Sequence, residues 1–240
     1  MRQAQRGTGT GSQVPVPVRA VMFDAGDTLI RLRGRSGSLV RVAADALGMP
    51  VDAEAASRVW DQVLAAAGTS EELAKGRDLT EARHRQVWTS LYAAAGAERL
   101  AEGLSVALYD LTVDPASWEL CPGATEVISA LRQAGVSVAV VSDTGFDLRP
   151  VFERLGLSAG VNAWVFSYEL GVCKPDPAVF RAACGLLGAA PGETLMVGDN
   201  PLTDGGAVSA GCRVLLLPPA SRHQSCLADV MSLVVTDDAP

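Results

Sequence analysis

The sequence contains few aromatic residues, little histidine and no long hydrophobic run. Aromatic residues make up 5% of the chain, and there are two histidines. Apolar runs such as VSVAVVS (136–142) and RVLLLPP (213–219) are much shorter than the roughly 20 residues that a membrane-spanning helix needs. The first 20 residues contain no apolar stretch of the kind found in a secretory signal. We therefore expect a protein without a membrane segment.

Basic charge and patterned cysteines are scarce as well. The chain has 20 Lys and Arg against 27 Asp and Glu, a formal net charge of −7. Such a balance argues against binding to nucleic acid polymers or anionic membranes, which require a basic face. The five cysteines form no CxxC pair, which favours reduced thiols and a cytoplasmic location: Cys121, Cys173, Cys184, Cys212 and Cys226.

Hydrophobic content and length indicate one large domain, or a main domain with an insert. The chain has 240 residues, of which 48% are hydrophobic. A short apolar run, Arg19–Phe23, comes first and predicts a strand. The following stretch is rich in Ala and Leu at helical spacing. It predicts helices and no strand: Ser38–Leu47, Ala53–Ala66, Thr80–Ala94 and Glu98–Leu111.

After Pro122–Gly123 the pattern changes to alternating helices and buried strands. The predicted strands are Val136–Val141, Ala163–Phe166, Thr194–Val197 and Val214–Leu217, and the predicted helices are Ala124–Gln133, Leu148–Leu155, Pro177–Leu187 and Asp204–Ala210. This order predicts a doubly wound, Rossmann-like α/β core with a parallel sheet and an inserted all-helical domain. We place the core at 18–34 and 114–240 and the helical insert at 35–113. Residues 1–17, and those after Val235, are expected to be flexible.

Four polar motifs follow the predicted strands or lie in the loops between the elements. They are FDAGDTL (Phe23–Leu29), VVSDTG (Val140–Gly145), GVCKPDPAVF (Gly171–Phe180) and VGDNPLTDGGAVSAG (Val197–Gly211). In open α/β sheets, ligands bind at the carboxyl ends of the strands. In this order, the motifs resemble those of the haloacid dehalogenase-like superfamily, whose members are mostly Mg²⁺-dependent phosphohydrolases. The helical insert resembles the family's type I cap.

The resemblance implies a role for each motif in phosphoryl transfer. Asp24 would be the nucleophile and would form an aspartyl-phosphate, which divides one difficult displacement into two easier ones. Lys174 and Ser142 would hold the phosphoryl oxygens as preorganised donors. Thr28 and Asp143 would lie beside the same substrate. The expected partner is a small phosphorylated metabolite, and the chain would act as a monomer or homodimer.

The resemblance also implies a Mg²⁺ site. Its ligands would be Asp24, the backbone carbonyl of Gly26, Asp199 and Asp204. Mg²⁺ prefers oxygen ligands and commonly uses one or two carboxylates together with a substrate phosphate. In the structural alternative, Asp199 forms a turn and Asp204 caps a helix.

The first motif departs from the family pattern. Phosphatases of the family usually carry an aspartate two residues after the nucleophile, where it acts as general acid and base. Here that position is Gly26, and an aspartate follows at Asp27. Adjacent residues point in different directions, so Asp27 is not an automatic replacement. Three hypotheses remain. In the first, Asp27 or an insert residue such as His84 supplies the proton. In the second, the leaving group needs no acid, as in an acyl phosphate or activated ester, and in the third the protein binds its ligand without turnover.

Two other reactions of the family are weaker alternatives. The metal-independent dehalogenases also lack an aspartate at the Gly26 position, but their last motif need not keep carboxylates such as Asp199 and Asp204. Phosphonate cleavage usually involves a lysine in the cap, and Lys75 is the only lysine of the insert.

Two sets of insert residues remain to be assigned. Arg31, Arg33 and Arg35 follow the first motif and are candidates for the hinge or the phosphate site. Trp60, Trp88 and Tyr92 have the spacing of helix core positions and are interpreted as packing residues.

Overall fold

The core of the protein is a parallel five-stranded sheet. The computed structural model describes residues 16–34, 37–218 and 227–234. The sheet has the order β5-β4-β1-β6-β7. Its strands are β1 (Ala20–Phe23), β4 (Ser137–Ser142), β5 (Ala163–Phe166), β6 (Thr194–Gly198) and β7 (Arg213–Leu216). The chain winds outward from β1 through β4 and β5, and then returns to β6 on the other side of β1. This is the predicted doubly wound topology, with the switch point between β1 and β6.

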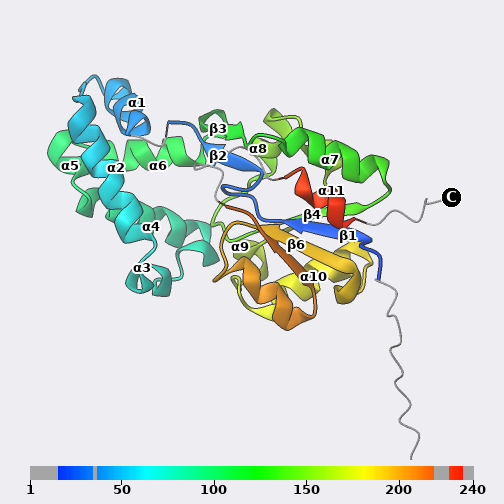
Figure 1. The fold of residues 1–240 in the computed structure, drawn as a ribbon. Coiled ribbons are helices and arrows are strands. Elements are labelled where there is room, and N and C mark those ends of the chain that lie inside the picture. Colours follow the sequence, from blue (N-terminus) through cyan, green and yellow to red (C-terminus); the bar gives the residue numbers. More distant parts are fainter. Residues whose placement is uncertain (1–15, 35–36, 219–226, 235–240) are drawn as a thin grey trace, which may run out of the picture.

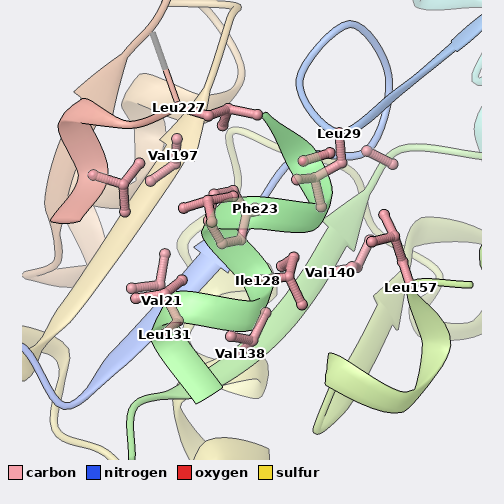
Figure 2. Close-up of a cluster of buried hydrophobic side chains, with 14 of the residues drawn as sticks. Val21, Phe23, Leu29, Ile128, Leu131, Val138, Val140, Leu157, Val197 and Leu227 are labelled. Carbon is pink, nitrogen blue, oxygen red and sulfur yellow. The ribbon is translucent and has the colours of Figure 1, made fainter. Parts of the chain in front are cut away.

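Helices cover both faces of the sheet because its strands are buried on both faces (Figure 1). Val21 and Phe23 of β1 pack into one cluster, and Met22 between them packs into the other. The first face is covered by α7 (Ala124–Gln133), α8 (Arg149–Arg154) and α11 (Asp229–Leu233). The second face is covered by α10 (Pro177–Leu187) and the 3-10 helix η5 (Asp204–Ala210). Figure 2 shows Ile128 and Leu131 of α7 lying against Phe23 and Val138.

A helical insert with its own core follows the first strand. Its elements are α1 (Ser38–Ala46), α2 (Ala53–Ala67), α3 (Ser70–Ala74), η1 (Arg77–Leu79), α4 (Glu81–Ala94), α5 (Ala97–Leu100) and α6 (Leu104–Val113). Val40, Val59, Leu91 and Leu108 belong to a buried cluster separate from those of the sheet. The insert lies at one end of the molecule, beyond β2 and β3 (Figure 1).

A short antiparallel ribbon joins the insert to the sheet domain. It pairs β2 (Ile30–Leu32) with β3 (Trp118–Leu120), which follows η2 (Pro115–Ser117). The Arg31 Nε donates to Glu119 at 2.8 Å, and the Arg33 Nε donates to the Trp118 carbonyl at 3.1 Å. Both arginines therefore brace the connection between the two parts.

Several sequence predictions of local structure were wrong. The single helix expected over Glu98–Leu111 is divided, because Ala101 is extended and Gly103 takes a left-handed φ of 78°. The Glu98 carboxylate accepts the N–H groups of Gly103 and Ser105 and so begins α6. The segment Asp204–Ala210 forms a 3-10 helix, not an α-helix. The sequence did not predict the short elements β2, β3, α3, α9 (Ser167–Leu170) and α11. It also did not predict the 3-10 turns η1, η2, η3 (Ser158–Gly160) and η4 (Pro191–Glu193).

The structure does not describe the residues at the two ends of the chain. Residues 1–15 of the predicted tail and residues 235–240 lie outside the described residues. Within the described ranges, no helix is long and apolar enough to cross a membrane. Three cysteines in these ranges are free thiols: Cys173, Cys184 and Cys212.

Candidate active site

The carboxyl ends of three neighbouring strands bring together acidic side chains from three motifs. Asp24 directly follows β1, Asp143 follows β4 and Asp199 follows β6. The Asp24 N–H donates to the Val197 carbonyl at 2.9 Å, which extends the pairing of β1 with β6 by one residue. The nucleophile candidate is therefore held at the switch point by the sheet itself.

Lys174 connects the acidic groups of the site. Its ammonium nitrogen lies 2.6 Å from Asp24 Oδ1 and 2.6 Å from Asp204 Oδ1. Its backbone N–H donates to Asp143 Oδ1 at 2.9 Å. The residue is buried, and it comes from the loop before α10. A single lysine thus orders carboxylates from three different motifs.

Two glycines allow this close approach, and sequence reasoning gave neither of them a role. A Cβ on Gly198 would lie 2.1 Å from Asp204 Oδ2, and a Cβ on Gly206 would lie 2.4 Å from the Pro175 Cβ. Asp204 Oδ2 also accepts the Asn200 N–H at 3.0 Å. Glycine at the end of an apolar strand was the available signal, because it commonly marks a close approach of backbone to another group.

Burial and mutual repulsion raise the pKa of the acidic groups. Burial raises the pKa of Asp24 to about 7 against the opposing charge of Lys174, while the charges of Asp204 and Asp199 add to the rise. Burial, together with the charges of Asp27 and Asp204, raises the pKa of Asp199 to about 6. Burial also raises the pKa of Asp143. Although burial opposes it, the surrounding carboxylates hold the pKa of Lys174 above its usual range.

The donor set suits a hard divalent cation. Asp24, Asp199 and Asp204 each offer an oxygen, and these atoms lie within 4.8 Å of one another. All three donors are carboxylates, the ligand type that Mg²⁺ prefers. With Asp143 added, four carboxylates face one lysine, so that a cation would relieve an excess of negative charge. The residues present therefore fit a divalent metal.

Gly26 and Asp27, the second and third residues after Asp24, have different environments. A Cβ on Gly26 would meet nothing within 4 Å, and its φ is not left-handed. Asp27 has a φ of 59°, which is uncommon for a residue with a side chain but tolerated by aspartate. Its N–H donates to the Ile30 carbonyl at 2.8 Å. The Asp27 side chain is close enough to Asp199 to raise the pKa of that carboxyl.

Ser142 and Thr28 are both buried. Ser142 ends β4 beside Asp143, on the same edge of the sheet as Asp24. The Thr28 hydroxyl has no hydrogen-bond partner among the described residues. Of the four predicted substrate-binding residues, Ser142 and Asp143 line the cavity described next, and Thr28 and Lys174 do not.

A cavity of about 250 Å³, which we call the chamber, lies between the insert and the edge of the sheet. Gly26, Ser142 and Asp143 form part of its wall on the sheet side. The loop after β4 adds Thr144, Phe146 and Leu148. Insert residues and the ribbon form the rest: Leu32, Trp60, Val63, Leu64, Ala67, Arg77, Asp78, His84, Trp88, Tyr92, Thr112 and Trp118. The chamber wall thus includes Trp60, Trp88 and Tyr92, for which only packing was predicted, and these three also pack with the insert core.

His84 is a packed, neutral residue of the chamber wall. Its Nδ1 lies 3.1 Å from the Tyr109 hydroxyl, and its Nε2 lies 3.7 Å from Asp78 Oδ1. Burial and the charge of Arg77 lower the pKa of His84 to about 4. A Cβ on Gly145 would lie 2.2 Å from the His84 Cβ, so the loop after β4 and helix α4 are in close contact. Because His84 is neutral near pH 7, it has no ready proton to donate.

Lys75 does not take part in the site. Its ammonium group pairs with Glu72 on the surface of the insert, and it does not line the chamber. The phosphonate-cleaving alternative therefore gains no support.

Comparison with known proteins identifies a family. The sequence model for haloacid dehalogenase-like hydrolases matches residues 18–211. "Haloacid dehalogenase-like hydrolase domain-containing protein 3" of Bos taurus is 29% identical over 190 residues, which cover 76% of this chain and 74% of the relative. Phosphoserine phosphatase of Thermus thermophilus is 34% identical over 135 residues, covering 55% of this chain and 53% of the relative.

A solved structure supports the fold. The crystal structure of a dehalogenase superposes with a TM-score of 0.64 at 22% identity, covering 92% of this chain and 98% of that one. At this level of identity, the match establishes the fold alone.

Proposed function

The chain belongs to the haloacid dehalogenase-like hydrolase family, and from this premise we propose that it hydrolyses a small phosphorylated metabolite through an aspartyl-phosphate on Asp24. In the first step, a carboxylate oxygen of Asp24 attacks phosphorus, and the bond between phosphorus and the leaving-group oxygen breaks. In the second step, water attacks the same phosphorus, which frees inorganic phosphate and restores Asp24.

Lys174 and Ser142 are proposed to hold the transferred group. Lys174 is already 2.6 Å from the nucleophile, so its charge favours the ionised form of Asp24 against burial, orients the carboxylate and meets the incoming phosphoryl oxygens from one side. Ser142 lies on the chamber wall at the end of β4 and offers its hydroxyl from the other. Asp143 fixes the backbone of Lys174 and thereby the position of its side chain.

Asp24, Asp199, Asp204 and the carbonyl of Gly26 are proposed to hold Mg²⁺. The observation that carries this is the convergence of three carboxylate oxygens within 4.8 Å of one another. Bound Mg²⁺ would polarise the phosphoryl group and offset the repulsion between Asp24 and an anionic substrate. The same convergence disfavours metal-independent dehalogenation, which has no use for Asp199 and Asp204 as metal ligands.

The absence of a carboxylate at Gly26 bears on the leaving group. General acid catalysis typically contributes about 10²–10⁴ in rate, and its loss is most harmful for a poor leaving group. Asp27 is next to Asp199 and does not line the chamber. We therefore favour a substrate whose leaving group departs without protonation, such as an acyl phosphate or an activated ester.

Phosphate release tests the proposal directly. Acetyl phosphate and p-nitrophenyl phosphate would be assayed with Mg²⁺ and with chelator, on the wild type and on Asp24→Asn. We expect release that requires Mg²⁺ and is lost in Asp24→Asn. Release that survives the substitution would refute Asp24 as nucleophile. Chloride release from a 2-chlorocarboxylate without metal would instead establish the dehalogenase alternative.

If neither reaction occurs in the folded protein, the non-catalytic alternative is favoured. That alternative predicts the same metal site and the same fold. It is separated from the enzyme by turnover alone.

A further inference from the structure

The chamber is positioned to receive the organic part of a substrate. Gly26 belongs to the loop after β1 that carries Asp24, and Ser142 and Asp143 lie at the end of the neighbouring strand β4. All three line the chamber on the sheet side, next to Asp24 and Lys174, which do not line it. The opposite wall comes from helices α2 and α4 of the insert and from the ribbon. A phosphoryl group held at Asp24 and Lys174 would therefore direct its leaving group into this space.

The chamber wall is mostly aromatic and apolar. Three of the chain's four tryptophans line it: Trp60, Trp88 and Trp118. Tyr92 and Phe146 extend the aromatic surface, with ring centroids 5.7 Å apart for Trp88 and Tyr92 and 6.3 Å apart for Trp118 and Phe146. Flat faces of this kind favour a planar, apolar guest.

The polar groups of the wall are few and mostly satisfied by one another. The Arg77 guanidinium lies 4.8 Å from the ring centre of Trp88, 3.3 Å from Asp78 Oδ2 and 2.6 Å from the Ala67 carbonyl. Its charge is thus already partnered. A sugar would bring several hydroxyl groups into this space without enough partners for them, which disfavours its binding.

Two donors in the wall lack a partner. The indole N–H groups of Trp60 and Trp88 are buried, and neither has a hydrogen-bond partner within the described part of the chain. Because both nitrogens are covered by neighbouring atoms, neither N–H group opens on the chamber. Trp60 and Trp88 therefore line the chamber with other parts of their rings.

The missing acid points to the same kind of leaving group. Gly26 carries no carboxyl group, and the two carboxyl groups that line the chamber are engaged elsewhere: Asp78 pairs with Arg77, and Asp143 accepts the Lys174 N–H. We therefore expect the leaving oxygen to depart with its electron pair and no proton. A phenol, like the tyrosine side chain, ionises far more readily than an alkyl alcohol. An aryl phosphate would satisfy both the aromatic wall and the missing acid.

We propose that the chamber selects aryl monophosphates and holds the aryl ring against its aromatic wall. This inference rests on the proposed function. The phosphorus–oxygen bond of the aryl ester breaks as Asp24 attacks, and the phenolate leaves with the bonding pair. Water then attacks phosphorus to restore Asp24, and the phenolate takes up a proton from solvent.

Kinetics on matched substrates test the selectivity. The wild type would be assayed with phenyl phosphate, 4-acetylphenyl phosphate, cyclohexyl phosphate and glucose 6-phosphate. We expect kcat/KM to be highest for 4-acetylphenyl phosphate and lowest for the sugar. Equal or better use of glucose 6-phosphate would overturn the inference while leaving the proposed function intact.

Variants of the wall test the site. Ala67→Phe places a ring in the chamber, so it is expected to remove activity on the aryl substrates and to retain that on acetyl phosphate. The double variant Trp60→Phe, Trp88→Phe replaces two indole rings by smaller ones, so we expect kcat/KM for 4-acetylphenyl phosphate to fall about three- to tenfold. The matched control is Trp164→Phe, because Trp164 packs against Phe152 and Phe166 away from the chamber. An equal loss in the control would contradict the assignment.

Fluorescence separates binding from turnover. The Asp24→Asn protein would be titrated with 4-acetylphenyl phosphate, and its tryptophan emission followed. We expect a saturable change that Ala67→Phe abolishes and Trp164→Phe retains. This result would support the chamber even if no substrate were turned over. A titration without any change would overturn the inference even if phosphate release were found.

Discussion

Replacing Gly26 by aspartate restores an acid at the position where phosphatases of the family usually carry one. The site has room for it, because a Cβ on Gly26 would meet nothing within 4 Å and the backbone there is not left-handed. Gly26 also lines the chamber, where the leaving group is proposed to lie. The first atom of the new side chain therefore meets no neighbour, and the side chain starts from the wall of the chamber.

The size of the gain follows from the role of a general acid. Its contribution is about 10²–10⁴ in rate, or about 3–5 kcal/mol of activation free energy. A carboxylate about 5 Å from Asp24, at an effective dielectric constant of about 20, would feel about 3 kcal/mol of repulsion. That repulsion raises the pKa of the new group by about two pH units, so it is protonated up to about pH 6.

We expect the gain to depend on the leaving group and on pH. For Gly26→Asp, kcat/KM on an alkyl phosphate should rise by at least about a hundredfold near pH 6 and fall back as the pH increases. For acetyl phosphate, which needs no acid, the change should be within about threefold. Phosphate release across pH 5 to 8 measures both, with Gly26→Asn as the control of equal size.

Two outcomes would refute this reasoning. An equal gain in Gly26→Asn would show that the new side chain does not act by proton donation. The second outcome is an unchanged rate on alkyl phosphates, in a Gly26→Asp variant that unfolds at the same urea concentration as the wild type. This result would show that the missing acid does not limit the reaction.

Three further predictions follow from buried groups. Lys174→Met leaves Asp24 and Asp204 without their shared cation, so the free energy of urea unfolding without metal should fall by about 3–5 kcal/mol. Mg²⁺ should restore part of this loss. An unchanged free energy of unfolding would contradict the ion pairing. Gly145→Ala places a methyl group against His84, so the free energy of unfolding should fall by about 1–3 kcal/mol and activity should decrease. The control Gly185→Ala, where the new methyl group meets nothing within 4 Å, should lower neither. Burial raises the pKa of Asp78 from 3.8 to about 6, so the contribution of this carboxyl group to stability is complete below pH 3.8 and is lost as the pH rises through 6. In urea titrations, Asp78→Asn should therefore be more stable than wild type by up to about 3 kcal/mol at pH 7.5, and by much less at pH 4.5. A difference that is independent of pH would contradict this.

The sheet was predictable because each strand is an uninterrupted apolar run that ends at a polar or glycine residue. Val197, Gly198 and Asp199 show the pattern: the apolar run ends, the chain turns, and a carboxylate appears at the edge. Parallel strands place their carboxyl ends at one edge, so the meeting of Asp24 with Asp199 follows from local sequence and topology.

The ribbon and the chamber were not predictable in the same way. Strands β2 and β3 have three residues each and pair across the whole insert, so no local periodicity marks them. Trp60, Trp88 and Trp118 come from separate elements and have the spacing of ordinary core residues. Their shared cavity depends on how the insert packs on the sheet, which is a property of the tertiary structure.

The role of Lys174 came from the motif resemblance. Nothing in the segment GVCKPDP by itself places a lysine between Asp24 and Asp204. Burial of its charge is tolerated because the carboxylates around it compensate for the lost hydration.

The most direct test of the account is a search for the phosphoryl group on Asp24. Wild-type protein with Mg²⁺ would be mixed with acetyl phosphate, quenched in acid within milliseconds, digested and examined by mass spectrometry. The account predicts phosphorylation of the peptide that contains Asp24, with none in Asp24→Asn. Two results would contradict the aspartyl-phosphate mechanism. One is phosphate release by the wild type with no phosphopeptide at any quench time, and the other is equal phosphate release by Asp24→Asn.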